Sequence, residues 1–313
     1  MEWSERIGRR LKLRDLHLLM TVVQKGSMAK AAAELAVSQP AVSKAIADME
    51  HTLGLRLLDR GRNGVEPTAY GRALVKRGLT IFDELKQGVE ELEFLADPSV
   101  GSLRIGSTES IAAGMLPVII ERFCREHPGV RLDVAQTVIS TLHYRELRER
   151  SIDLLIGRIP TPFAEDDLAA DIVYDDQVVV VAGRQSKWAR SRKPRLADLG
   201  GEPWVLPSAD TMPGALAAEI FRAGGTKMPR APVTTLSIHL CCRLAASGRF
   251  ITMLPISILR FGGHDLSLKV LPIEVPSQPR PVGIATLKNR TPSPVANRFV
   301  ACVHRVLGRT PKA

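Results

Sequence analysis

The side chains that stand out for their chemistry lie in a short segment, Ser38-Gln39-Pro40-Ala41-Val42-Ser43-Lys44. Gln39 can form two hydrogen bonds with the major-groove edge of adenine, Ser43 can serve either base type, and Lys44 can reach guanine or phosphate. The apolar surface of Pro40 can meet the methyl group of thymine. This combination predicts direct contact with the edges of DNA bases.

Arginines a little further along the chain suit the phosphate backbone of the same partner. Arg62 lies in a glycine-rich stretch and is the first candidate for a phosphate contact. Arg60 and Arg56 precede it and are further candidates. Arginine side chains and helix starts are common phosphate contacts in protein–DNA complexes. The candidate DNA-binding residues also include two hydroxyl residues that precede predicted helices, Ser38 and Thr68.

The elements that must present these residues are short helices with clear boundaries. Residues 13–25 have apolar side chains at helical spacing, and Gly26 ends that helix. Ser27 caps the next helix, at 28–35, and Ser38 caps the third. A short helix, a tight turn and a capped second helix predict a helix-turn-helix motif from Met28 to Ala47. The expected buried face consists of Val42, Ile46, Met49 and Leu53, with Gln39, Ser43, Lys44 and Ala47 opposite. A helix-turn-helix in a protein that does not bind DNA remains the alternative.

A hairpin and a long helix are predicted to follow. Two short extended pieces flank the turn from Gly61 to Gly64, so residues 11–68 are predicted to form a winged helix-turn-helix domain. Thr68 then begins a helix over 69–96, which we assign to a linker and dimerisation segment at 69–97. Its apolar residues recur at 3,4 spacing, as in a coiled coil. A helix lying on its own domain is the alternative. The seam consists of Val75, Gly78, Phe82, Leu85, Val89, Leu92 and Ala96.

Strands and helices alternate beyond a hinge at residues 97–101, which predicts an α/β domain with a parallel sheet over 101–310. Strands are expected at 103–106, 130–135, 152–157, 177–182, 232–236 and 250–254. Helices are expected at 111–127, 142–150, 214–223, 239–247 and 296–307. Two late segments, 268–273 and 281–286, are expected to cross back to the first βαβ unit.

Charge and composition favour a polyanionic partner. The net charge is +10, and residues 1–80 carry 14 basic and 8 acidic side chains, whereas residues 81–100 carry 1 and 6. No apolar run approaches membrane-spanning length, and the first residues lack a signal-peptide pattern, so we expect a cytoplasmic protein without membrane contact. The four cysteines, at 124, 241, 242 and 302, form no spaced pair and are expected to be reduced thiols.

Enzyme chemistry has little support in the sequence. There is no nucleophile-elbow, zinc-protease or P-loop pattern, and the seven histidines have no metal-ligand spacing. We therefore expect a protein that is not an enzyme and has no metal and no cofactor.

The segment from Gly26 to Lys44, Gly-Ser-Met-Ala-Lys-Ala-Ala-Ala-Glu-Leu-Ala-Val-Ser-Gln-Pro-Ala-Val-Ser-Lys, resembles the signature of LysR-type regulators. The patterns Glu50-x-x-Leu53-Gly54 and Pro67-Thr68-x-x-Gly71 extend the match, and the Leu116-Pro117 and Ile152–Gly157 segments resemble the family's effector domain. Lys44 stands where the family more often has arginine, and lysine lacks the bidentate fork that reads guanine.

This resemblance implies a fold and a mode of action. The C-terminal part would be a type 2 periplasmic-binding-protein-like effector domain of two α/β subdomains, with a small inducer in the cleft between them. The protein would bind double-stranded promoter DNA as a homodimer or homotetramer, contact RNA polymerase and usually activate transcription. The chain also resembles the branch of the family that includes a galactose-binding-protein regulator.

Hydroxyl residues at predicted strand ends are the candidates for holding a sugar or an organic acid. The first subdomain offers Ser107, Thr108, Thr137 and Val138, and the second offers Pro207, Ser208, Thr235 and Ser237. The alternative is that these hydroxyls only cap helices. Glu109 would repel an anion at this place, which favours a neutral, sugar-like ligand.

Two other classes of protein remain open. The first is a metabolite-binding protein whose helix-turn-helix serves assembly only. The second is an α/β enzyme fused to a DNA anchor.

Overall fold

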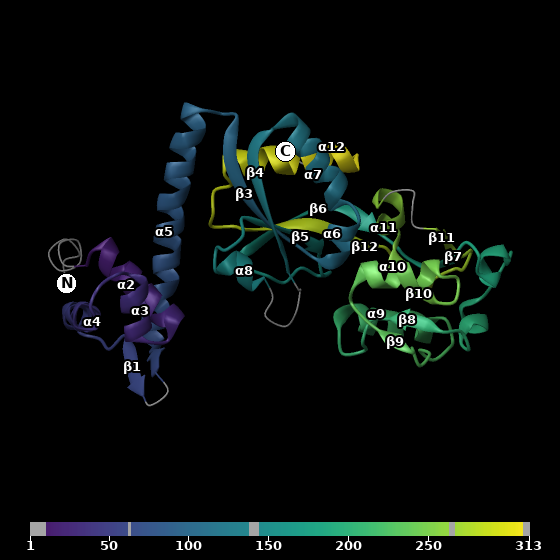
Figure 1. Cartoon of the computed structure of the whole chain (residues 1–313), viewed down its shortest axis with the longest axis horizontal. Helices are drawn as coiled ribbons and strands as arrows, with labels where there is room; N and C mark the ends of the chain where they lie inside the picture. Colours follow the sequence, from purple (N-terminus) through teal and green to yellow (C-terminus); the bar gives the residue numbers. More distant parts are fainter. Residues whose placement is uncertain (1–10, 62–63, 138–143, 263–266, 309–313) are drawn as a thin grey trace. The chain divides into compact units, whose positions relative to one another are not determined.

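The computed structural model describes residues 11–61, 64–137, 144–262 and 267–308. The chain divides into two compact units, Met1–Val89 and Glu90–Ala313 (Figure 1). Across the described residues, none of the helices is both long and apolar enough to span a lipid bilayer.

Three helices begin the first unit, and each boundary has a local cause. The side chain of Ser27 accepts a hydrogen bond from the backbone of Lys30, and that of Ser38 accepts one from the backbone of Ala41. Gly26 and Gly54 end two of the helices with left-handed backbone. The predicted boundaries are confirmed to within a residue. The helices are α2 (Leu13–Lys25), α3 (Met28–Glu34) and α4 (Gln39–Leu53).

The core of this unit is the predicted apolar face of α4 packed against α2 and α3. Val42 and Ile46 have no exposed surface, and Met49 is almost as deeply buried. Ala31 of α3 is also fully buried, and its small side chain lets a neighbouring helix approach α3 closely. The packing fixes the rotation of α4 about its axis, and so decides which residues face solvent.

The predicted hairpin consists of β1 (Leu58–Gly61) and β2 (Gly64–Pro67), which pair antiparallel. Hydrogen bonds hold it to the helices. The backbone N–H of Val65 donates to the carbonyl of Gly26 at 3.0 Å. The carboxylate of Glu50 accepts hydrogen bonds from the backbone N–H groups of Leu57 and Leu58 at 2.7 and 3.1 Å. Glu50 therefore joins the end of α4 to the start of the hairpin.

The long helix α5 (Ala69–Ala96) follows the hairpin. Its predicted seam is only partly correct, because the first half of it packs within its own unit. Gly78 lies against Leu16 and Met20 of α2, and the ring of Phe82 packs at a tilt against that of His17, with ring centroids 5.5 Å apart. The alternative interpretation, a helix lying on its own domain, holds for this half.

The second half of α5 keeps its apolar side chains in solvent. Leu85, Val89 and Leu92 are 48, 55 and 67% exposed, and Ile81 and Leu95 are exposed as well. These five residues, which we call the α5 stripe, recur at intervals of three and four and thus share one face of the helix.

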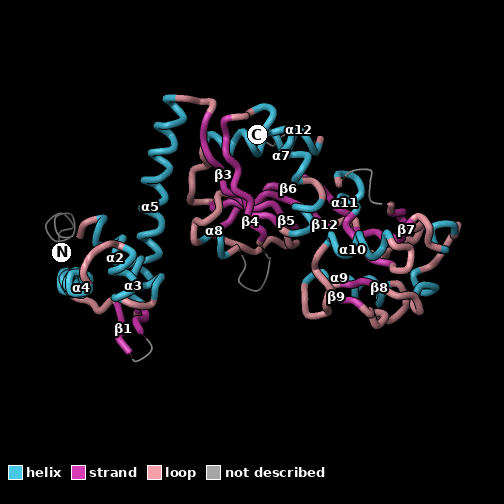
Figure 2. The backbone as a smooth tube through the Cα atoms, viewed as in Figure 1, coloured by secondary structure: helices cyan, strands magenta, loops and turns pink. Residues whose placement is uncertain are grey.

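The second unit begins with a five-stranded sheet in the order β4-β3-β5-β12-β6. Strands β3, β4 and β5 are parallel, whereas β12 pairs antiparallel with β5 and β6. We call this sheet and its helices subdomain I (Figure 2). Its strands are β3 (Val100–Ser107), β4 (Gly129–Gln136), β5 (Leu154–Arg158), β6 (Leu168–Asp176) and β12 (Arg280–Leu287). Its helices are α6 (Glu109–Ala113), α7 (Leu116–Glu126), α8 (Arg145–Arg148) and α12 (Pro294–Leu307).

Subdomain II is built on a second sheet in the order β11-β7-β10-β8-β9. The chain enters it after β6 and returns to subdomain I at β12, as the sequence predicted for the segment at 281–286. The strands are β7 (Val178–Gly183), β8 (Trp204–Leu206), β9 (Val233–Thr234), β10 (Ile251–Pro255) and β11 (Leu268–Val270). The helices are α9 (Met212–Ala223), α10 (Ile238–Ala246) and α11 (Ile256–Phe261), with 3-10 turns at Lys187–Arg190 and Leu196–Leu199.

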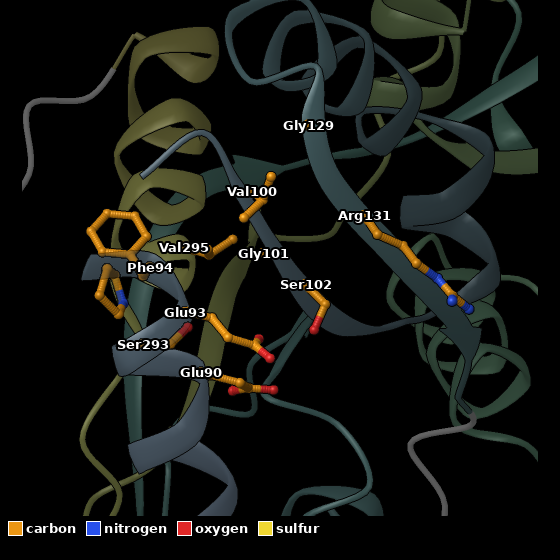
Figure 3. A pocket seen from close by; sticks show the side chains of 11 residues that line it. Glu90, Glu93, Phe94, Val100, Gly101, Ser102, Gly129, Arg131, Ser293 and Val295 are labelled. Carbon is orange, nitrogen blue, oxygen red and sulfur yellow. The ribbon is translucent and has the colours of Figure 1, made fainter. Parts of the chain in front are cut away.

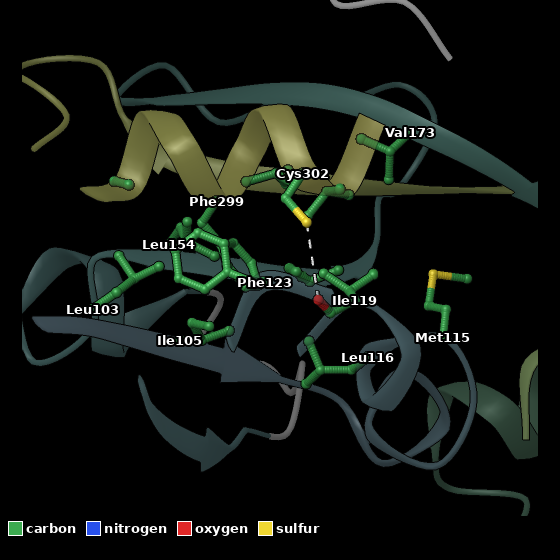
Figure 4. Close-up of a cluster of buried hydrophobic side chains, with 14 of the residues drawn as sticks. Leu103, Ile105, Met115, Leu116, Ile119, Phe123, Leu154, Val173, Phe299 and Cys302 are labelled. Atoms are coloured by element: carbon green, nitrogen blue, oxygen red, sulfur yellow. Dashed lines mark hydrogen bonds between the residues drawn. The ribbon is translucent and has the colours of Figure 1, made fainter. Parts of the chain in front are cut away.

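The core of subdomain I lies between its sheet and the helices α7 and α12 (Figure 4). Phe123 of α7 and Phe299 of α12 meet edge to face, with ring centroids 5.2 Å apart, and both are fully buried. The thiol of Cys302 points across the same core toward the carbonyl of Ile119. This packing fixes the sheet whose strand ends carry the candidate effector residues.

Several predictions for the second unit need correction. The helix expected at 111–127 is two helices, because the chain bends at Gly114 between α6 and α7. The helix expected at 142–150 is shorter: α8 covers Arg145–Arg148 and is followed by a turn at 149–150, while residues 142–143 lie outside the described residues. The sheets are mixed and not simply parallel, and the late segment at 268–273 stays in the second sheet as β11. Strands β6 and β8 and helix α11 were not predicted.

Candidate nucleic-acid interface and effector cleft

The start of α4 presents the predicted base-reading residues to solvent. Gln39, Pro40 and Lys44 are exposed and Ser43 is half-buried, while the opposite face of the helix is in the core. Ser38 is also exposed, and its hydroxyl caps the helix. A helix that shows an amide, a hydroxyl and an ammonium group at its first turns has the form that enters a major groove.

The other predicted DNA-contacting side chains differ in whether their polar groups are exposed or already hydrogen-bonded within the protein. Arg60 of β1 and Arg56, shortly before that strand, are exposed, and Arg62 lies outside the described residues. The hydroxyl of Thr68 is held by the protein: it lies 2.8 Å from the carbonyl of Arg56 and accepts a hydrogen bond from the backbone of Gly71. Thr68 therefore fixes the junction between the hairpin and α5.

The candidate effector residues of subdomain I lie where parallel strands end. Ser107 ends β3, Thr108 precedes α6, and Thr137 follows β4 directly. The backbone N–H of Thr137 donates to the carbonyl of Ser107 at 2.8 Å, so these ends are neighbours. Val138 lies outside the described residues.

The hydroxyl groups of these three residues differ in their hydrogen bonding. Ser107 is fully buried, and its hydroxyl donates to the carbonyl of Thr108. The hydroxyls of Thr108 and Thr137 are buried without a hydrogen-bond partner among the described residues. A buried hydroxyl without a partner is unfavourable, and an incoming ligand can relieve that cost. These two are the best candidates to meet an effector.

The candidates from subdomain II are engaged within the protein. The hydroxyl of Ser237 caps α10 through the backbone of Leu240, and that of Thr235 accepts a hydrogen bond from the backbone of Ser237. Pro207 is half-buried and Ser208 exposed, both directly after β8. For Thr235 and Ser237, the capping alternative describes what their side chains do in this structure.

Glu109 acquires a role that the sequence did not predict. Its carboxylate accepts hydrogen bonds from the backbone N–H of Ile238, at 3.2 Å, and from the side chain of Gln136, at 2.9 Å. Ile238 is the first residue of α10. The structure thus brings the start of α6 in subdomain I to the start of α10 in subdomain II.

Arg158 is a second residue that sequence reasoning missed. It ends β5, and one terminal nitrogen of its guanidinium is buried without a partner among the described residues. Burial lowers the pKa of this guanidinium, although the charge of Asp176 opposes the effect. Both carboxylate oxygens of Asp176 are already bonded to Ser257 of α11. In the sequence, the feature that could have indicated this residue is an arginine that directly follows a continuous apolar strand.

A shallow hollow of about 300 Å³ lies elsewhere in the second unit (Figure 3). It lies where the end of α5 meets the starts of β3, β4 and α12, and Glu90 and Glu93 supply its acidic groups. None of the predicted effector residues lines it, so it is not the predicted cleft. Within the described part of the chain, no cluster of His, Cys, Asp or Glu side chains is arranged to hold a metal ion.

Comparison with known families accounts for nearly the whole chain. Residues 13–72 match the family described as "Bacterial regulatory helix-turn-helix protein, lysR family", and residues 96–308 match "LysR substrate binding domain".

Curated relatives that align with nearly the whole chain are named as transcriptional regulators. The chain is 28% identical to the HTH-type transcriptional regulator GbpR of Azospirillum brasilense over 295 residues, which cover 94% of this chain and 86% of that protein. It is also 28% identical to the transcriptional dual regulator GltC of Bacillus subtilis, over 92% of this chain and 95% of the other.

Solved structures share the fold. The full-length LysR family regulator CbnR has a TM-score of 0.63 at 20% identity, over 95% of this chain and 99% of that chain. CbnR in complex with its target DNA has the same TM-score at 21% identity, over 95% of this chain and all of the other.

Proposed function

The chain belongs to the LysR family of bacterial helix-turn-helix regulators, and from this premise we propose that it is a promoter-binding activator controlled by a small organic effector. The observation that carries the proposal is the start of α4, where Gln39, Pro40 and Lys44 are exposed on the side of the helix opposite its buried apolar residues. The function lies in binding and not in catalysis: the relatives named above are regulators.

In the proposed complex, α4 lies in the major groove. Gln39 pairs with adenine, Ser43 serves either base type, and Lys44 meets guanine or phosphate. Pro40 offers apolar surface to a thymine methyl group. Arg56, Arg60 and Arg62 bind the phosphate backbone next to the groove, and the positive end of the α4 dipole adds to the attraction.

The proposed assembly is a homodimer, or a homotetramer built from two such dimers. The α5 stripe supports it, because five exposed apolar side chains on one helix face are a liability in water unless a second copy covers them. A dimer places two α4 helices on the half-sites of a near-palindromic promoter. CbnR, which shares the fold, has been solved in complex with its target DNA.

The proposed sensor is the cleft between subdomains I and II. Thr108 and Thr137 support this assignment, since their buried hydroxyls lack partners among the described residues. A sugar or a hydroxylated organic acid supplies such partners. Effector binding changes the angle between the subdomains and, through α5, the arrangement of the DNA-binding domains, which alters contact with RNA polymerase in the cytoplasm.

A gel-shift assay with the DNA upstream of the chain's own gene tests the proposal. We expect a specific complex that an excess of an unrelated duplex of equal length does not displace. Its mobility or affinity should change with an effector found by thermal-shift screening of sugars and organic acids. The absence of a shifted complex with either duplex would favour a metabolite-binding protein whose helix-turn-helix serves assembly. Chemical conversion of the effector, followed by mass spectrometry, would favour an enzyme.

A further inference from the structure

The carboxylate of Glu109 connects the two subdomains. Glu109 is the first residue of α6 in subdomain I, and one of its oxygens accepts a hydrogen bond from the backbone N–H of Ile238, the first residue of α10 in subdomain II. Its other oxygen accepts from the side chain of Gln136 at the end of β4. One charged group thus joins three elements across the proposed effector cleft.

The position that Glu109 occupies is one that favours an anion. The start of a helix has free N–H groups and the positive end of the helix dipole, so carboxylates and phosphates bind there readily. Helix α10 has nine residues, and the hydroxyl of Ser237 accepts a hydrogen bond from the backbone N–H of Leu240. The N–H of Ile238 therefore needs another acceptor. Glu109 supplies it from the other side of the cleft.

The adjacent side chains indicate that a ligand belongs beside this bond. Thr108 precedes Glu109 and Thr137 follows Gln136, and both threonine hydroxyls are buried without a partner in the described part of the chain. Thr137 as a whole is only 4% exposed. Polar groups in this state are the exception in folded proteins, and contact with a bound molecule is one way in which they gain a partner.

We propose that Glu109 is a built-in carboxylate ligand, which fills the anion position at the start of α10 and holds the two subdomains together there in the absence of effector. The inference rests on the proposed sensor function of the cleft. It defines the effector's chemistry at this end: hydroxyl groups meet Thr108 and Thr137, and an acid group is kept from α10 by the charge already there.

Chemical rescue of the full-length chain tests the proposal. In Glu109→Ala, amide hydrogen exchange in the first turn of α10 should become about tenfold faster or more, because Ile238 has lost its acceptor. Acetate should then occupy the vacated position, slow this exchange again and raise the melting temperature, whereas chloride at equal ionic strength should not. Glu109→Ser is a second variant that vacates the position, should the alanine variant fold poorly.

Two variants control the interpretation. Glu109→Gln keeps the side-chain volume and one oxygen acceptor, so acetate should have no effect on it or on the unchanged chain. Glu121→Ala removes an exposed carboxylate from α7 and should show neither faster exchange in α10 nor rescue. If acetate protects α10 no better in the vacated variants than in the unchanged chain, the built-in ligand is refuted. Rescue requires neither DNA nor effector, so its failure is separable from a failure of the regulatory function in the gel-shift assay.

Discussion

The exposed side chains at the start of α4 differ in how much sequence information each can carry. The amide of Gln39 has both a donor and an acceptor, and adenine presents the complementary pair in the major groove. Lys44 has donors only, on a flexible stem, so it attracts guanine and phosphate without strong discrimination. Base selectivity should therefore depend more on Gln39, and general affinity more on Lys44.

This difference predicts the result of Gln39→Ala. The substitution should cost about 1–3 kcal/mol on the preferred site and much less on a site altered at the base pair that Gln39 reads. Competition binding with a set of singly substituted duplexes measures it. Gln24→Ala, which removes an exposed amide from α2, is the matched control and should bind like the unchanged chain. An equal loss on every duplex would mean that Gln39 does not read a base.

Single residues were predictable where their environment is local. The exposed face of α4 follows from the spacing of its apolar residues, and Ser27 and Ser38 cap the helices they precede. Glu109 and Arg158 were not, because their surroundings come from distant parts of the chain. The partner of Glu109 lies 129 residues away, so local spacing showed only that its charge would repel an anion.

Backbone segments pack closely where α5 leaves the hairpin. A Cβ atom added at Gly71 would lie 2.1 Å from the carbonyl oxygen of Leu57, which is backbone and cannot move aside cheaply. Gly71→Ala should therefore destabilise the first unit by about 1–3 kcal/mol, as overpacking does. Thermal unfolding followed by circular dichroism measures the change. Gly61→Ala, where a Cβ would meet nothing within 4 Å, should leave the melting temperature nearly unchanged. Equal stability of the two variants would contradict this account of α5.

The α5 stripe carries a prediction about assembly. Leu85→Glu places a charge among side chains that a second copy is proposed to cover, and should weaken the dimer roughly 30-fold or more, equivalent to about 2 kcal/mol. Sedimentation equilibrium measures the dissociation constant. Glu91→Lys changes the charge of an exposed neighbour outside the stripe and should have a small effect. A variant Leu85→Glu that dimerises as tightly as the unchanged chain would place the interface elsewhere.

Helices and strands could be predicted where the features that determine them lie in their own sequence. The helices of the first unit have amphipathic spacing, and serine or glycine marks several of their ends. Each was found within a residue of its expected bounds. Strand β6 was missed because it has no clean alternation: aspartates interrupt it at 171, 175 and 176. Its pairing partner, β12, begins more than 100 residues later, so its place in the sheet has no signal in its own sequence.

At the scale of the whole molecule, the basic charge is distributed over both units, but only part of it is placed to meet DNA. Residues 1–80 carry 14 basic side chains and residues 101–313 carry 28, against 8 and 19 acidic ones. Affinity for DNA depends on the cations that neutralise phosphates, not on the total charge. The surplus in the effector domain should therefore contribute little to binding.

Salt dependence separates the two contributions. The logarithm of the DNA-binding constant should fall linearly with the logarithm of salt concentration, because each phosphate neutralised by a lysine or arginine releases bound counterions. Lys44→Gln should reduce the magnitude of this slope by about 1 for each copy of the chain on the DNA, if its ammonium meets phosphate. Lys227→Gln removes an exposed lysine from subdomain II and should leave the slope unchanged. An equal reduction in both variants would mean that the effector domain also contacts DNA. No change in the Lys44 variant, with affinity lost at a single base pair, would instead assign Lys44 to guanine.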